Sequence, residues 1–265
     1  MHPAQQTLPA NSNHSGKPFW LRLMTHNHHS KGNSVLNLVI WYVRKPGLTL
    51  AESIEANHRV HGELTKRGPD DFTETVYRYI QNYPFDAAYG KTGAKNFDGV
   101  SELTFLSSET LKANLEHPYY LNTVKPDGQN FADEAANVIH LASEEVVFTP
   151  LLGEGIKVIR WLQTMPDADP ADFEDFWTKS YDRDIRHLPG LLGYSRNRLP
   201  EGHHGLQGLP PTAFDSFWLD GKQDIAAFQQ YARQFVTEGQ NQHLVDAENY
   251  FYLLCEERRV IDRIS

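Results

Sequence analysis

The feature of this sequence that most constrains its fold is an internal repeat with a very long period. At a shift of 120 residues Trp41 falls on Trp161, and with small changes of shift the agreement continues along most of the chain. The further matched pairs are Pro46 and Pro166, Ala51 and Ala171, Glu52 and Asp172, His61 and Tyr181, Tyr79 and Tyr194, Asn82 and Asn197, Phe97-Asp98 and Phe214-Asp215, and Asp133 and Asp246. A repeat of this length indicates two copies of one supersecondary unit.

The hydrophobic pattern predicts the same order of elements in each copy: strand, helix, strand, strand, helix, strand. An apolar, β-branched run ends at a Lys-Pro-Gly turn, and Thr49 with Glu52 forms a capping box that starts a helix. Asp169 and Pro170 start the corresponding helix of the second copy. We expect strands at 35–43, 75–81, 99–105 and 138–147, a helix from 108 to 118, and second-copy strands at 157–165, 193–197, 216–219 and 250–256. This order is the ferredoxin-like βαββαβ arrangement.

One such unit covers only one face of its sheet with helices, so the other apolar face must be buried against something else. Two units packed sheet to sheet solve this problem within one chain. The sequence therefore predicts an α+β fold in which two tandem ferredoxin-like repeats, residues 35–150 and 151–265, form an intrachain barrel with helices outside. Residues 1–34 contain no acidic residue and are rich in Asn, Ser, Pro and His, which is typical of a disordered leader, with a targeting peptide as the alternative.

Composition excludes several classes of function. The chain has 25 basic and 34 acidic residues, a net charge of −9, which argues against nucleic acid or an anionic membrane as a partner. It has no apolar run long enough to span a bilayer. Its single cysteine, Cys255, allows no internal disulfide, and we expect a reducing, cytoplasmic location. A homodimer of the two-repeat units is one expected assembly.

Three segments resemble a known family. The run VIWYVRKPGLT, the helix AESIEANHRVHGEL and the strand FDGVSELTF are similar to the EthD family of the dimeric α+β barrel superfamily. The resemblance covers residues 35–150 well and 156–262 more faintly, where RHLPGLLGYSRN keeps a Leu-Pro-Gly turn. It implies an enzyme that works without a cofactor and uses the helical histidine as an acid or base.

The candidate catalytic residues are His61 and Asn57, one helical turn apart. A histidine facing an apolar pocket can accept or give a proton near neutral pH. The alternative is a buried histidine bonded to backbone, and for Asn57 a polar residue at a helix edge. The second repeat carries Trp177 and Tyr181 at these positions, so we expect one histidine-bearing pocket and a second, degenerate repeat.

Further polar and aromatic side chains are candidates for substrate binding. Tyr79, Asn82 and Asp98 could supply polar groups to the pocket mouth, or could simply shape strand ends and turns. Trp177, Tyr181 and Tyr194 could line a second cavity, or belong to the core. His58 and His61 are expected on two helix faces rather than around one metal ion, and no phosphate, dinucleotide or metal motif is present, so no cofactor is predicted.

The expected function is acid/base chemistry of the dehydratase or lyase, cyclase or isomerase type on a small hydrophobic aromatic or carbonyl compound. A cofactor-free monooxygenase, an oxidoreductase of a phenolic substrate, is the second hypothesis. A non-catalytic protein that binds small molecules for a catabolic pathway is the third.

Overall fold

The computed structural model describes residues 35–85, 90–91, 97–148, 155–199, 206–207 and 211–263. The predicted leader, residues 1–34, lies outside the described residues.

The first half of the described chain builds four long strands and a group of short helices. The strands are β1 (Leu36–Tyr42), β2 (Arg78–Pro84), β4 (Gly99–Phe105) and β5 (Val138–Phe148), with the short β3 (Gly90–Lys91) between β2 and β4. The α-helices are α2 (Leu50–Glu55), α3 (Glu63–Lys66), α4 (Asp70–Thr73), α5 (Ser108–Glu116) and α6 (Lys125–Asp127). Two π-helical segments, η1 (Ala56–Gly62) and η2 (Tyr120–Val124), and the 3₁₀ turn η3 (Gly128–Asn130) complete it.

The second half repeats the layout with longer helices. Its strands are β6 (Ile156–Leu162), β7 (Leu191–Arg198), β8 (Ala213–Leu219) and β9 (Phe251–Asp262). Its α-helices are α7 (Pro170–Arg183) and α8 (Ile225–Asn241), accompanied by 3₁₀ turns η4 (Ile185–His187), η5 (Lys222–Asp224) and η6 (Ala247–Asn249). The predicted strands all exist, although β2 starts three residues later than expected and β9 runs six residues further.

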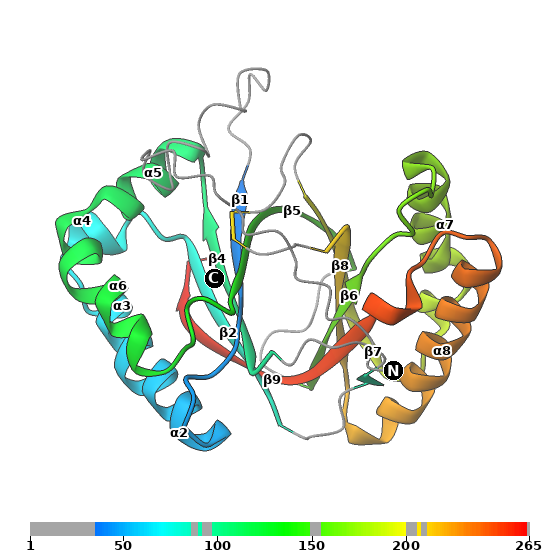
Figure 1. Cartoon of the computed structure of the whole chain (residues 1–265), viewed down its shortest axis with the longest axis horizontal. Coiled ribbons are helices and arrows are strands. Elements are labelled where there is room, and N and C mark those ends of the chain that lie inside the picture. Colours follow the sequence, from blue (N-terminus) through cyan, green and yellow to red (C-terminus); the bar gives the residue numbers. More distant parts are fainter. Residues whose placement is uncertain are drawn as a thin grey trace, which may run out of the picture.

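The strands close into an antiparallel barrel. The order is β2-β4-β1-β5 in the first half and β7-β8-β6-β9 in the second. In each half the second main strand is followed in space by the third, the first and the fourth, so the relative order is the same. The pairs β5–β7 and β2–β9 join the halves on both sides and close the ring of eight strands. In Figure 1 the helices of the first half flank one side of this barrel, and α7 and α8 flank the other.

Local sequence explains why the first helix begins where it does. The Thr49 side chain accepts from the Glu52 backbone N–H, and the Glu52 carboxylate accepts from the Thr49 backbone N–H, which is the predicted capping box. The expected regular helix does not continue, however, because the chain changes to π-helical winding at Ala56 and keeps it to Gly62.

One end of the barrel interior is apolar. Trp41 and Trp161 meet edge to face with ring centroids 4.9 Å apart, and Phe214 and Phe251 pack against Trp41. The indole of Trp41 donates a 3.0 Å hydrogen bond to Nε2 of the buried His140. Burial lowers the pKa of His140 to about 4, so the ring stays neutral and can accept this bond at neutral pH.

The rest of the interior holds buried ion pairs. Lys157 of β6 lies 2.6 Å from Glu102 of β4 and 3.3 Å from Glu257 of β9, and its side chain is only 1% exposed. Burial opposes the charge on Lys157, but the two carboxylates outweigh it and raise its pKa. Arg78 and Glu144 form another pair at 2.6 Å. The Glu102–Lys157 pair joins β4 of the first half to β6 of the second. Ion pairs as well as apolar contacts therefore hold the two halves together.

We expect Lys157→Met to destabilise the protein by about 3–5 kcal/mol, since it leaves the Glu102 carboxylate buried without its ammonium partner. The double variant Lys157→Met/Glu102→Gln removes both charges and should recover most of that loss. Chemical denaturation of the two variants and the wild type measures both effects. A double variant no more stable than the single one would contradict the role assigned to this pair.

Candidate active site

A cluster of buried polar side chains lies between the η1 segment and the outer face of the first-half sheet. Tyr79, Gln81 and Tyr83 alternate along β2 and are all buried. Asn57, on the helical side, is also buried. Gln81 connects the two layers, because its Nε2 donates to the Asn57 side-chain oxygen at 2.9 Å and to the Tyr79 hydroxyl at 2.8 Å.

The π-helical winding of η1 presents several residues of one short segment to this cluster. Asn57 bonds to Gln81, and Nδ1 of His58 lies 2.9 Å from the Gln81 side-chain oxygen. Gly62 allows the close approach, since a Cβ there would lie 3.3 Å from the Gln81 amide nitrogen. Segments of π-helix are rare and often occur at functional sites.

His61 pairs with a carboxylate from a distant part of the chain. Its Nδ1 lies 3.1 Å from Oδ2 of Asp127, and the two side chains are 17% and 11% exposed. The hydrogen bond with His61 lowers the pKa of Asp127, so the carboxylate stays ionised at neutral pH. Asn130 donates to the other Asp127 oxygen at 2.8 Å and holds it in place. With its Nδ1–H donated to Asp127, the imidazole keeps Nε2 for proton transfer.

Phe131 separates the histidine from the tyrosines and is fixed by its backbone. Its ring lies 5.1 Å from the His61 ring and 5.7 Å from the Tyr42 ring, between centroids. Its carbonyl accepts hydrogen bonds from the Ser53 hydroxyl and from the Lys45 backbone N–H. His61 and Tyr42 therefore flank one rigid aromatic wall.

Three buried polar groups of this cluster have no well-formed hydrogen bond to the part of the protein that the structure describes, although the Asn57 side chain interacts with the Tyr42 hydroxyl and partly offsets the rise of its pKa on burial. The three groups are the hydroxyls of Tyr42 and Tyr83 and the amide nitrogen of Asn57. Burial raises the pKa of both Tyr42 and Tyr83, and raises that of Tyr79 to about 12. All three phenols are therefore neutral at physiological pH.

Gly99 positions Tyr42. The two residues are paired across β1 and β4, and a Cβ on Gly99 would lie 2.5 Å from the Tyr42 hydroxyl oxygen. The tyrosine ring therefore crosses the strand above a residue that has no side chain. This contact gives a physical reason for the glycine in the FDGV segment.

The second half fills the corresponding layer differently. The Trp177 indole donates a 2.7 Å hydrogen bond to Asp215, which forms a fully buried ion pair with Arg160. Burial raises the pKa of Asp215 above its ordinary value, although Arg160 opposes the shift. The Tyr231 hydroxyl accepts a further bond from Arg160 at 2.8 Å. A bulky indole and an ion pair thus occupy the region where the first half has Asn57 and its neighbours.

The predicted aromatic residues of the second half belong mainly to its core. Trp177 and Tyr194 are fully buried in the cluster between the sheet and helices α7 and α8. Tyr181 is half-buried and stacks on Tyr194 with ring centroids 5.6 Å apart. The structure brings these three residues together but gives no cavity lined by them among the described residues.

Two of the predicted binding residues, Asn82 and Asp98, have side chains that bind partners outside the His61 cluster. Asn82 points to the barrel interior, where its amide donates to Glu102 at 2.7 Å, because successive side chains of a strand face opposite sides of a sheet. Asp98 directly precedes β4, and its carboxylate accepts hydrogen bonds from the Arg44 guanidinium at 3.0 Å and from the Arg44 backbone N–H at 2.8 Å. Its own backbone N–H donates to the Tyr42 carbonyl at 2.8 Å, so Asp98 lies beside Tyr42 with its side chain paired to Arg44. Asn82 faces the other side of the sheet, and its placement at the pocket of His61 was wrong for that reason.

The sheet register also corrects one matched pair of the repeat. Trp41 pairs with Val100 and Trp161 pairs with Phe214, so Asp215 corresponds in the sheet to Ser101 and not to Asp98. Tyr79 and Tyr194 do occupy matching positions, since they pair with Leu103 and Phe217.

Sequence reasoning missed four residues of the cluster: Tyr42, Gln81, Tyr83 and Asp127. The period-two pattern of β2 could have found Gln81 and Tyr83, because they share the face of Tyr79. Nothing local marks Asp127, which reaches His61 only through the tertiary fold.

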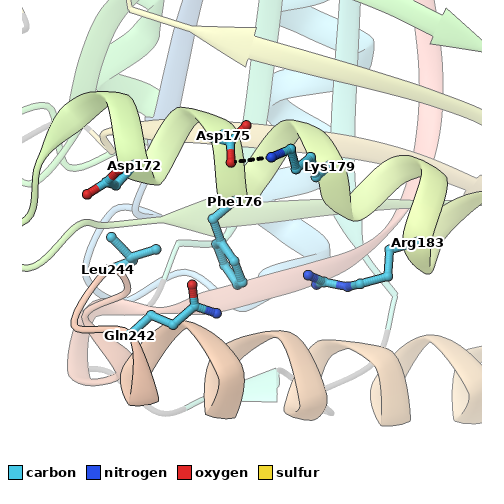
Figure 2. A pocket seen from close by; sticks show the side chains of 7 residues that line it. All are labelled: Asp172, Asp175, Phe176, Lys179, Arg183, Gln242 and Leu244. Atoms are coloured by element: carbon cyan, nitrogen blue, oxygen red, sulfur yellow. Dashed lines mark hydrogen bonds and ion pairs between the residues drawn. The ribbon is translucent and has the colours of Figure 1, made fainter.

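A separate pocket of about 380 Å³ lies between α7 and the C-terminal end of α8 (Figure 2). Its lining residues are Asp172, Asp175, Phe176, Lys179, Arg183, Gln242 and Leu244. Lys179 pairs with Asp175 at 2.7 Å, and Arg183 pairs with Glu238 at 2.9 Å. None of the predicted site residues lines it, so it is not the candidate active site.

We expect Gly99→Ala to destabilise the protein by about 1–3 kcal/mol, because the added methyl group overlaps the Tyr42 ring. Gly128→Ala is the matched control. Gly128 has helical φ and ψ angles and only the Glu134 side chain near a new Cβ, at 3.2 Å. Thermal melting compares the two variants. If both melt like the wild type, the Tyr42 ring does not cross β4 at this point.

Comparisons with known proteins support the fold and identify a family domain in the first half. Residues 45–135 match the family model described as the EthD domain. Among solved structures, an anthrone oxidase-like protein matches with a TM-score of 0.54 and 12% identity over 89% of this chain and 97% of its own. The chlorite dismutase from Candidatus Nitrospira defluvii matches with a TM-score of 0.51 and 7% identity over 87% and 93%. No curated protein matches the chain in sequence. At these identities the structural likenesses show the barrel fold alone.

Proposed function

Because the chain carries an EthD domain in residues 45–135, we propose that it is a cofactor-independent enzyme whose acid/base group is His61. The observation that carries the proposal is the half-buried pair of His61 and Asp127, beside a cluster of buried polar groups. The substrate class is a small hydrophobic aromatic or carbonyl compound, and the reaction is of the dehydratase or lyase, cyclase or isomerase type.

Asp127 prepares His61 for this role. The ionised carboxylate accepts the Nδ1 proton, which fixes the ring orientation and leaves the Nε2 lone pair to remove a proton from the substrate. When the imidazole becomes positively charged, the neighbouring carboxylate stabilises it. The protonated ring can then return the proton to a leaving group or to another carbon atom. A metal ion is not needed for any of these steps.

We further propose that the two halves, residues 35–150 and 151–265, are tandem copies of one unit and that only the first is an active site. The shared strand order and the matching registers of Tyr79 and Tyr194 support this view. In the second half Trp177, Asp215 and Arg160 fill the layer with bulky and mutually paired groups.

The second candidate is a cofactor-free monooxygenase. The neighbour described as an anthrone oxidase-like protein favours it. The same removal of a proton from a phenolic substrate would give a carbanion able to reduce oxygen. Oxygen consumption on turnover distinguishes this reaction from a dehydration. A protein that only binds small molecules is the third candidate, and it would show saturable binding without turnover.

We propose a cytoplasmic location with no nucleic acid or membrane partner, and a homodimer as one assembly. None of the described helices combines the length and the apolar content that a membrane span requires.

We expect His61→Gln to lower kcat by on the order of 10² to 10⁴, the effect of losing an acid/base group. Tyr181→Phe, the matched change in the second half, removes only a hydroxyl and should cost far less. Turnover of one substrate and thermal melting are measured for both variants. Equal damage in two folded variants would place the active site across both halves or in the second.

We expect Asp127→Asn to lower kcat by on the order of 10²-fold or more while leaving KM nearly unchanged, because the amide no longer fixes the proton on Nδ1. Asn130→Ala, which leaves the carboxylate in place, should have a much smaller effect. Steady-state kinetics of the two variants test this. An Asp127→Asn enzyme with wild-type kcat would show that His61 acts without its carboxylate.

A further inference from the structure

We infer that Tyr42, Tyr83 and Asn57 form a binding site for one anionic oxygen of the substrate, an enolate or phenolate oxygen. This inference rests on the proposed function, since removal of a proton by His61 would place negative charge on such an oxygen. The three residues are 2%, 2% and 1% exposed.

Their polar groups are buried and lack a well-formed hydrogen bond within the described residues, and the side chains of Asn57 and Tyr42 interact with each other. Leaving a buried hydrogen-bonding group unpaired costs about 1–3 kcal/mol. Here the Tyr42 hydroxyl, the Tyr83 hydroxyl and the Asn57 amide nitrogen share this condition in one layer, within the part of the chain that the structure describes. A bound ligand that accepts these hydrogen bonds would remove this energetic cost.

The orientation of Asn57 is set by its neighbours. Its side-chain oxygen accepts a hydrogen bond from Gln81, so its NH₂ group is the end that can donate to a ligand. The Gln81 side chain is itself fixed in orientation. Its oxygen lies 2.9 Å from Nδ1 of His58, and its nitrogen also donates to the backbone carbonyl of Asn57 at 3.1 Å. The asparagine therefore presents a donor and not an acceptor.

The two tyrosines are also fixed as donors. Burial raises the pKa of each hydroxyl, so neither ionises at neutral pH. Tyr42 is placed by Gly99, as described above. The Arg258 guanidinium of β9 lies 5.3 Å from the Tyr83 ring centre, and its charge is paired with Glu256 at 3.0 Å. Neutral hydrogen-bond donors that are fixed in place stabilise an anionic oxygen more than a neutral one.

Two nearby carboxylates act electrostatically on Tyr42 and Tyr83, and both are paired: Asp98 with Arg44, and Glu256 with Arg258. The groups offered are hydroxyl and amide donors, and the nearby carboxylate of Asp127 is already occupied by His61 and Asn130. The ligand class is thus a flat, hydrophobic molecule with one acidic oxygen, which Phe131 and the tyrosine rings can contact.

The test uses 4-nitrophenol, studied above its own pKa so that it is the phenolate, and 4-nitroanisole, which has the same shape without the charge. Binding to the full chain is measured by calorimetry and by the change in nitrophenolate absorbance. The wild type should bind the phenolate more tightly. Tyr42→Phe and Tyr83→Phe should each weaken phenolate binding about tenfold or more and leave 4-nitroanisole binding unchanged.

Stability provides the second readout. Because the Tyr42 and Tyr83 hydroxyls have no well-formed hydrogen bond within the described residues, their removal should keep or raise the melting temperature. Tyr119→Phe is the matched control, since the Tyr119 hydroxyl donates to the Leu64 carbonyl at 3.0 Å. That variant should lose stability and keep its affinity for the phenolate.

Equal affinities of the wild type for the two ligands, no binding of either, or wild-type phenolate binding by both tyrosine variants would overturn the inference. His61→Gln separates it from the proposed function. If that variant still turns over substrate while the tyrosine variants lose phenolate binding, the proposed function fails and the oxygen site stands. If His61→Gln is inactive and both tyrosine variants bind the phenolate like the wild type, the proposed function stands and the oxygen site fails.

Discussion

The constraint on which this structure depends is that each half leaves one face of its sheet uncovered by helices. The two halves cover each other, and the pairs β5–β7 and β2–β9 remove all four sheet edges at once. Inside, tryptophans and buried ion pairs fill the space. The candidate site lies outside this interior, in the layer between the first-half sheet and its helices.

The two outer layers bury different polar groups. In the second half Asp215 binds both Arg160 and the Trp177 indole, although Arg160 Nε has no well-formed hydrogen bond within the described residues. In the first half neutral groups take this place, and the Tyr42 and Tyr83 hydroxyls and the Asn57 amide nitrogen likewise lack a well-formed hydrogen bond within the described residues. A fold can carry a few such groups at an energetic cost, and they concentrate where a protein meets its ligands.

The sequence predicted the fold well because its signals are local and repeated. The capping box at Thr49, the alternation of β4 and the motifs that recur in the two halves all depend on a few neighbouring residues. The site was harder to predict. The π-helical winding changes which residues face the sheet, and no local pattern reports that change. Asn82 follows Gln81 directly on β2 and therefore faces the opposite side of the sheet. Asp127 lies 66 residues from its partner His61 in the sequence.

The contact between Arg258 and Tyr83 has a consequence for how such a protein can evolve. Arg258 belongs to β9, the last strand of the chain, whereas Tyr83 belongs to β2 of the first half. One wall of the polar cluster is therefore provided by the second half of the chain. Substitutions in this strand would alter the cluster even if they left the layer of helices over the second half intact. Transplanting the histidine-bearing half into another protein would carry over its helices and its tyrosines but leave this wall behind.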